Sequence, residues 1–131
     1  MILLDTHVLV WLAADAGRLS RSAAAAIRKA FTSGGLAIAS ITLWELAMLF
    51  SRGRLRAQGT VEASVRALVE GTGVSIREIT PEVAALAAQF PSHFPADPAD
   101  RLIAATARAE SLPLVTSDEK IQASPLVKTI W

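Results

Sequence analysis

Short apolar runs that alternate with longer helix-like segments constrain the fold of this chain more than any other feature. The runs Ile2–Leu4 and Leu36–Ala39 are apolar at every position, so neither has a polar face that could meet solvent. Strands of this kind are typical of a parallel sheet that helices cover on both faces. Val74–Ile79 alternates as an edge strand does. The five predicted strands are Ile2–Leu4, Leu36–Ala39, Val74–Ile79, Leu112–Thr116 and Val127–Ile130.

Helical spacing of apolar residues predicts six helices between these strands. They are His7–Ala14, Ser20–Thr32, Ile41–Phe50, Thr60–Glu70, Pro81–Phe90 and Pro98–Ala107. Alternating strands and helices predict an α/β fold of three layers, with a mainly parallel central sheet between helices. Because crossover connections are right-handed, the carboxyl ends of the strands meet at one edge of the sheet, where ligand sites form.

Length and composition limit the classes of protein to consider. The 131 residues suit one domain over residues 1–131, and 52% of them are hydrophobic. No apolar run reaches the roughly 18 residues of a membrane span, and the start of the chain lacks the basic region of a signal peptide. Without cysteine there is no disulfide framework and no thiolate metal site. We expect a cytoplasmic protein, and the net charge of +1 means that any nucleic-acid surface is local.

Two acids stand at the start of the helix Pro98–Ala107, around which the candidate site is arranged. Asp97 occupies the N-cap position, and Pro98 has the first helical position that proline favours. Asp100 lies one short turn inside the helix, where a negative charge is held rigidly near the helix N-terminus. A purely structural role at the helix start would explain both acids, so the case for a functional role depends on other acids in the chain.

Three more acids fall at comparable places. Asp5 follows the first strand and Asp118 follows the fourth, so both are expected at the carboxyl edge of the sheet. Each could be a helix cap, but the neighbouring Thr6 and Ser117 could take that role instead. Glu45 is the one charged residue in an otherwise apolar helix. It lies little more than one turn after the start of that helix, so it stays near the same edge of the sheet.

Four carboxylates at one edge repel each other, and each raises the pKa of the others unless a cation neutralises the set. Oxygen ligands without cysteine favour Mg²⁺ or Mn²⁺ over zinc. Such a site suits hydrolysis of a phosphodiester bond with one or two metal ions. The hydroxyl groups of Thr6 and Ser117 are candidates to hydrogen-bond the ligand carboxylates. Glu119 is expected to be peripheral.

The densest basic cluster consists of Arg52, Arg54 and Arg56, on alternate residues around Gly53. Three roles remain open for these arginines. They could contact the phosphates of RNA, bind an acidic partner peptide, or simply be solvated.

Four stretches of the sequence resemble the motifs of PIN-domain ribonucleases of the VapC type, the toxins of VapBC toxin–antitoxin pairs. Each is weak alone, but together they span almost the whole chain in the order of that family. The stretches are Leu4–Leu12 (LDTHVLVWL), Leu43–Ala47 (LWELA), Asp97–Ala107 (DPADRLIAATA) and Leu114–Ile121 (LVTSDEKI).

The resemblance implies a PIN-like α/β/α fold, Mg²⁺- or Mn²⁺-dependent endoribonuclease activity, homodimerisation and neutralisation by a VapB-like antitoxin. Operator DNA would be bound only through the antitoxin complex, and transfer, ribosomal and messenger RNA all fit as substrates. The acidic site that the motifs imply is Asp5, Glu45, Asp100 and Asp118, with Asp97 as an added acid that tunes the site or caps its helix. The family often has a bulky aromatic residue where this chain has Ala99.

The sequence also has to be compared with three alternative functions. A haloacid-dehalogenase-like phosphatase needs a second aspartate two residues after the first, and position 7 is His7. A receiver domain needs a phospho-accepting aspartate at the end of a central strand, and Leu36–Ala39 supplies none. The third alternative is a PIN-fold dimer without catalysis that only binds an antitoxin and, through it, DNA.

Overall fold

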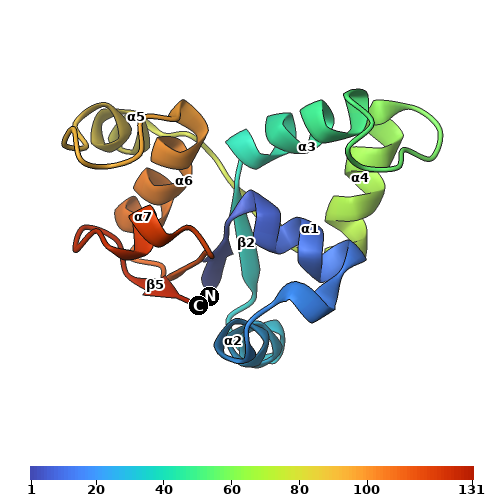
Figure 1. The fold of residues 1–131 in the computed structure, drawn as a ribbon, viewed down its shortest axis with the longest axis horizontal. Helices are drawn as coiled ribbons and strands as arrows, with labels where there is room; N and C mark the ends of the chain where they lie inside the picture. Colours follow the sequence, from blue (N-terminus) through green and yellow to red (C-terminus); the bar gives the residue numbers. More distant parts are fainter.

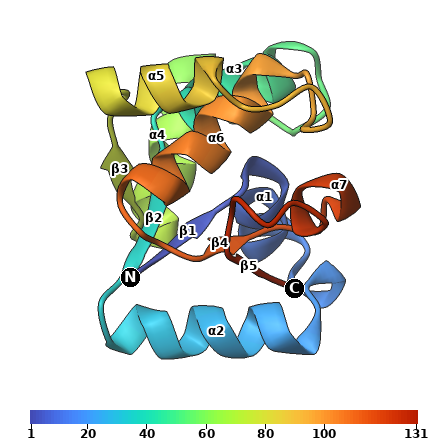
Figure 2. The same ribbon diagram turned by 90° about the vertical axis from the view of Figure 1, so that its left-hand side faces the viewer.

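A computed structural model describes all residues from 1 to 131 and contains a sheet of five parallel strands. Their order across the sheet is β3-β2-β1-β4-β5, so β1 is central (Figures 1 and 2). The parallel register pairs Leu3 of β1 with Ala37 of β2 on one side and with Leu114 of β4 on the other. The strands are β1 (Ile2–Leu4), β2 (Leu36–Ala39), β3 (Ser75–Arg77), β4 (Leu114–Val115) and β5 (Thr129–Ile130).

Helices cover both faces of the sheet and form three layers, as the alternation of strands and helices predicted. One face carries α5 (Pro81–Ala88), α6 (Pro98–Ala109) and α7 (Glu119–Gln122). The other face carries α1 (Thr6–Ala14) and α2 (Arg21–Thr32), with the 3-10 turn η1 (Ala16–Arg18) between them. The pair α3 (Ile41–Ser51) and α4 (Val61–Thr72) completes this side, and α3 also contacts α6. No helix is long and apolar enough to cross a membrane.

Side chains that alternate along the central strands divide the interior into two cores. In β1, Leu3 packs with α5 and α6, whereas Ile2 and Leu4 pack with α1 and α2. Alternate residues of β2 divide in the same way, with Ala37 and Ala39 in the first core and Leu36 and Ile38 in the second. Both faces of these strands are therefore buried, which explains why they carry no polar residue.

Three strands are shorter than predicted. Beyond Arg77, β3 has no partner, since β2 stops at Ala39. Before β4, Pro113 has no N–H, and the N–H of Leu112 bonds the carbonyl of Ala107 at 2.8 Å rather than a strand. Pairing of β5 starts at Thr129 instead of Val127.

Three helix ends lie two residues from their predicted positions, and one of them is the end of α6, which continues past Ala107 to Ala109. Helix α4 continues past Glu70 to Thr72 and ends at Gly73, whose φ of 69° is a left-handed conformation that glycine favours. Helix α5 ends at Ala88, two residues before Phe90.

Candidate active site

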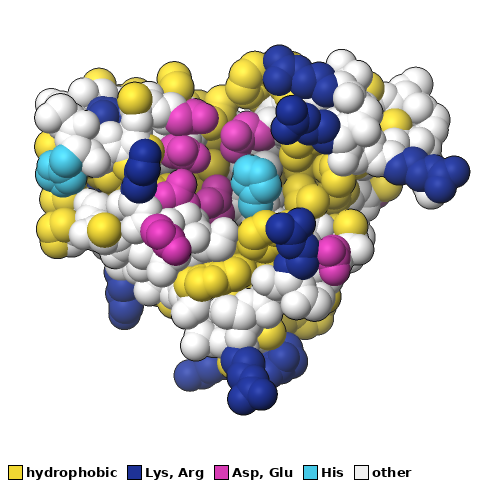
Figure 3. Space-filling model, viewed as in Figure 1, with side chains coloured by type: hydrophobic (Ala, Val, Ile, Leu, Met, Phe, Trp, Pro, Cys, Tyr) yellow, Lys and Arg dark blue, Asp and Glu magenta, His cyan; other side chains and the backbone are white.

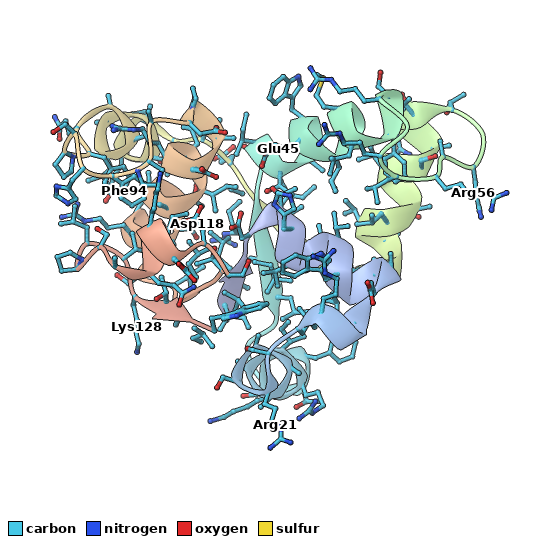
Figure 4. All side chains as sticks on the ribbon, in the orientation of Figure 1. Arg21, Glu45, Arg56, Phe94, Asp118 and Lys128 are labelled. Carbon is cyan, nitrogen blue, oxygen red and sulfur yellow. The ribbon has the colours of Figure 1, made fainter.

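The carboxyl edge of the sheet holds a pocket of about 380 Å³ that is lined largely by acids. Figure 3 shows these acidic side chains gathered around a hollow in this face. In Figure 4, Glu45 on α3 and Asp118 before α7 lie on either side of it. The lining residues are Asp5, His7, Trp11, Glu45, Asp97, Asp100, Ser117 and Asp118. The structure thus brings together all five acids that the sequence singled out.

Asp5 is buried at the end of β1, with 8% of its surface exposed. Its Oδ1 accepts the Thr6 N–H at 2.8 Å, which caps α1, and its Oδ2 accepts the Thr116 hydroxyl at 2.7 Å. Burial raises the pKa of Asp5, and the bonds from Thr116 and Thr6 offset part of that rise. Of the two capping residues that the sequence allowed, Asp5 takes the cap rather than Thr6, and it also lines the pocket.

Glu45 is held by a chain of two hydroxyl groups. The Thr6 hydroxyl donates to Glu45 Oε1 at 2.5 Å and lies 3.0 Å from the Thr42 hydroxyl. Since Thr6 has only one hydroxyl proton, Thr42 donates to Thr6. Partial burial raises the pKa of Glu45, the Thr6 bond lowers it, and the charge of Asp5 raises it further. The predicted bond between Thr6 and a site carboxylate is therefore present.

Asp97 and Asp100 enter the pocket from the start of α6. Asp97 Oδ1 accepts the Ala99 N–H at 2.8 Å and caps the helix, as predicted. Asp100 is half-buried and accepts no hydrogen bond. Burial, and then the charges of Asp97, Asp5, Asp118 and Glu45, raise its pKa to about 7. Asp100 is consequently the least compensated carboxylate of the set.

Thr116, a residue that the sequence did not point to, connects two of the acids. It is fully buried, donates to Asp5, and accepts the Asp118 N–H at 3.1 Å. Asp118 Oδ1 in turn accepts the N–H groups of Lys120 and Ile121 at 2.9 and 3.1 Å, and so caps α7. Ser117 lines the pocket but makes no side-chain hydrogen bond, so the capping and supporting roles for which it was a candidate belong to Asp118 and Thr116.

The pocket fits a hard divalent cation, since it is lined by five carboxylates, none of which forms an ion pair. No three His, Asp or Glu side chains are yet arranged to hold a metal ion. Binding a cation would require the carboxylates to rotate toward one another.

We expect Thr116→Val to weaken binding of Mg²⁺ or Mn²⁺ by roughly 10-fold, because Asp5 and Asp118 would lose the hydroxyl that positions both. The pKa of Asp5 would also rise further, so that a proton competes better with the metal. Titration calorimetry would measure the affinity, with Thr116→Ser as the control that keeps the hydroxyl. Equal affinities for the valine and serine variants would contradict this role.

The three arginines do not share this pocket. Arg52, Arg54 and Arg56 follow the far end of α3, and Figure 4 shows Arg56 well away from Glu45. Arg56 instead lines a second cavity of about 1030 Å³ between α1, α2 and the α3–α4 pair, where 11 of the 17 lining residues are hydrophobic. Glu119 is exposed and does not line the acidic pocket.

Comparison with known proteins identifies the family. A model of the PIN domain matches residues 2–124, which is nearly the whole chain. The chain belongs to the PIN domain family. This PIN domain is 42% identical to Ribonuclease VapC22 of Mycobacterium tuberculosis, over 99% of the chain and 98% of that relative. It is therefore a PIN domain of the VapC type, as its four motifs predicted.

Solved structures agree on the fold of this PIN domain. VapBC2 from Rickettsia felis, bound to a promoter DNA fragment, superposes with a TM-score of 0.73 at 19% identity, covering 98% of this chain and 97% of that one. FitAcB from Neisseria gonorrhoeae gives 0.69 at 25% identity, covering 98% and 96%. The three-layer α/β/α prediction is confirmed.

Proposed function

We propose that this PIN domain is a Mg²⁺- or Mn²⁺-dependent endoribonuclease toxin that a cognate antitoxin inhibits. The observation that carries the proposal is the pocket in which five acids meet without an ion pair to any of them, with the pKa of Asp100 raised to about 7. Such a pocket stores repulsion that a bound cation would relieve. The kinship with Ribonuclease VapC22 supports RNA as the substrate.

Each side chain then has a part in the reaction. Asp5, Asp100 and Asp118 would hold the metal, and Glu45 would complete its surroundings or orient a water molecule. When bound, the metal ion polarises the scissile phosphate and lowers the pKa of a bound water. Thr6 fixes the Glu45 carboxylate, while the Asp5 and Asp118 groups are fixed by Thr116.

We further propose the hydrophobic cavity beside Arg56 as the place where an antitoxin segment binds. Its lining is mostly apolar, and Arg28 and Arg56 at its edge suit an acidic flank of such a segment. Similar folds occur in structures described as toxin–antitoxin complexes, some with DNA. Operator DNA would be bound only through the antitoxin. We also propose a homodimer, which the 58% exposure of Trp44 supports.

The proposal is tested by incubating the purified protein with a pool of transfer, ribosomal and messenger RNA in Mg²⁺, in Mn²⁺ and in EDTA. We expect discrete fragments in either metal and none in EDTA. Asp5→Ala should remove the fragments, whereas Asp15→Ala should keep them, because Asp15 is the one aspartate outside the pocket.

The competing hypothesis is a PIN-fold dimer without catalysis that serves only to bind an antitoxin. Folded, antitoxin-free protein that cuts no RNA in either metal, yet binds its antitoxin tightly, would favour this hypothesis and contradict ours. The complete set of acids is the observation against it.

A further inference from the structure

One side of the acidic pocket is aromatic, which metal binding alone does not require. Of the eight lining residues, Trp11 is the single hydrophobic one, and His7 lies one helical turn before it on α1. The two rings have centroids 6.1 Å apart and are tilted by 49°. His7 is exposed and Trp11 is half-buried, so part of this ring pair faces the pocket and the solvent.

A positive charge is held against the same tryptophan. The guanidinium carbon of Arg18, at the end of η1, lies 4.7 Å from the centroid of a Trp11 ring. Arg18 is exposed and takes part in neither of the two ion pairs of the molecule, so its charge is free to bind an anion. Trp131 packs on Trp11 from another direction, with ring centroids 5.8 Å apart, and limits its movement.

This grouping has the chemistry of a single-stranded nucleotide site. Aromatic rings stack on bases of any sequence, and arginine pairs with phosphate while it stacks on an aromatic face. The acids next to it repel the RNA backbone, so a strand whose phosphate enters the pocket needs favourable contacts just outside it. In Figure 3 a hydrophobic band and a basic side chain lie beside the acidic hollow on the same face.

We propose that His7, Trp11 and Arg18 form a nucleotide subsite at the rim of the acidic pocket. A base of single-stranded RNA stacks on the His7–Trp11 pair, and a phosphate next to that base pairs with Arg18. The inference rests on the proposed function, because it names the part of the RNA that lies beside the cut. Since a base must leave its own stack to reach the rings, unpaired RNA is preferred over duplex.

The subsite is tested by binding, on a background of Asp100→Asn so that the RNA is not cut. The probes are fluorescent oligouridylate and an abasic oligonucleotide of equal length and charge, both in Mg²⁺. The variants are His7→Ala, Trp11→Phe and Arg18→Gln. Arg21→Gln is the control, because Arg21 is an exposed arginine on α2, far from Glu45 in Figure 4. Circular dichroism establishes that each variant is folded.

We expect the background protein to bind the base-bearing probe roughly 5-fold or more tighter than the abasic one. His7→Ala should reduce that preference toward unity, and Trp11→Phe should retain part of it. Arg18→Gln should weaken the binding of both probes. It should also reduce the slope of log affinity against log salt concentration by about one. No preference in the background protein, or His7→Ala and Arg18→Gln variants that match Arg21→Gln, would overturn the subsite.

Cleavage by proteins that retain Asp100 separates this inference from the proposed function. If these proteins cut no RNA while binding still depends on the base and on Arg18, the nuclease proposal fails and the subsite stands. If they cut RNA and His7→Ala and Arg18→Gln leave KM and the cleavage sites unchanged, the subsite fails and the nuclease stands.

Discussion

Asp100→Asn is expected to reduce RNA cleavage by roughly 10²–10³-fold or more and, at the same time, to stabilise the metal-free protein above pH 7. The loss of activity follows because an amide cannot supply the charge that holds a divalent cation. The gain in stability follows because Asp100 accepts no hydrogen bond and carries an unfavourable charge when it is ionised. Asparagine has the same shape without that charge.

The pH dependence has a definite sign. The pKa of Asp100 is about 7 in the folded protein, whereas the ordinary pKa of an aspartate side chain is 3.8, so the folded state binds more protons between these values. The free energy of unfolding therefore falls as pH rises from about 4 to 7, and the full penalty is present above 7. Because Asp100 is half-buried, solvent screens part of the effect, and we expect about 1 kcal/mol, or roughly 4 °C in Tm.

Thermal melts of the metal-free proteins at pH 4.5 and pH 8 would measure this effect. The two proteins should melt together at the lower pH, and the variant should melt higher at pH 8. Glu78→Gln is the control, since it removes one exposed acid outside the acidic pocket. A destabilised or unfolded Asp100→Asn protein at pH 8 would show instead that Asp100 supports the fold.

Arg101→Ala is expected to cost about 2–4 kcal/mol of unfolding free energy, or roughly 10 °C in Tm, and to impair cleavage. The Arg101 guanidinium donates to four carbonyl groups in the loop between α5 and α6. These bonds reach Pro95 at 2.8 Å, Phe90 at 3.0 Å, Pro91 at 3.3 Å and Phe94 at 3.4 Å. Without them, the half-buried carbonyls lose their donors just before Asp97 and Asp100.

The loop itself has a small core that should loosen with this change. The rings of Phe90 and Phe94 stack with centroids 4.3 Å apart, and both are buried. Arg101→Lys should rescue little, because one ammonium cannot reach four carbonyls in a fork. Arg108→Ala, at the exposed end of the same helix, should change stability by less than about 1 kcal/mol. Denaturant unfolding would measure all three, and an Arg101→Ala protein as stable as Arg108→Ala would contradict the argument.

Much of this site could be predicted because its acids are placed by local signals. Asp5 and Asp118 follow buried strands of a parallel sheet, so topology alone puts them at one edge. Asp97 precedes a proline at a helix start, and its capping role needs only the local sequence. The family motifs then pointed to the same four acids and Asp97.

The supporting residues could not be predicted in the same way, because their roles depend on tertiary distances. Thr116 bonds Asp5 across 111 positions of sequence, through the pairing of β1 with β4. Thr42 reaches Thr6 through the packing of α3 against α1. The position of Thr116 at the end of an apolar strand could have indicated its bond to Asp5. The position of Thr42, one turn before Glu45, could have indicated its contact with Thr6. Helical spacing predicts that the rings of His7 and Trp11 are neighbours. It does not predict that they face the acidic pocket.

Asp5 and Asp118 cap helices with the same side chains that line the acidic pocket, which affects how such a protein can lose its activity by mutation. A change to alanine at either position removes a helix cap, worth about 1 kcal/mol, in addition to a site carboxylate. Glu45 and Asp100 cap no helix, so replacing either one would inactivate the site without the loss of stability that removal of a cap causes. Inactive descendants that remain folded should therefore keep aspartate or asparagine at positions 5 and 118, and diverge first at positions 45 and 100.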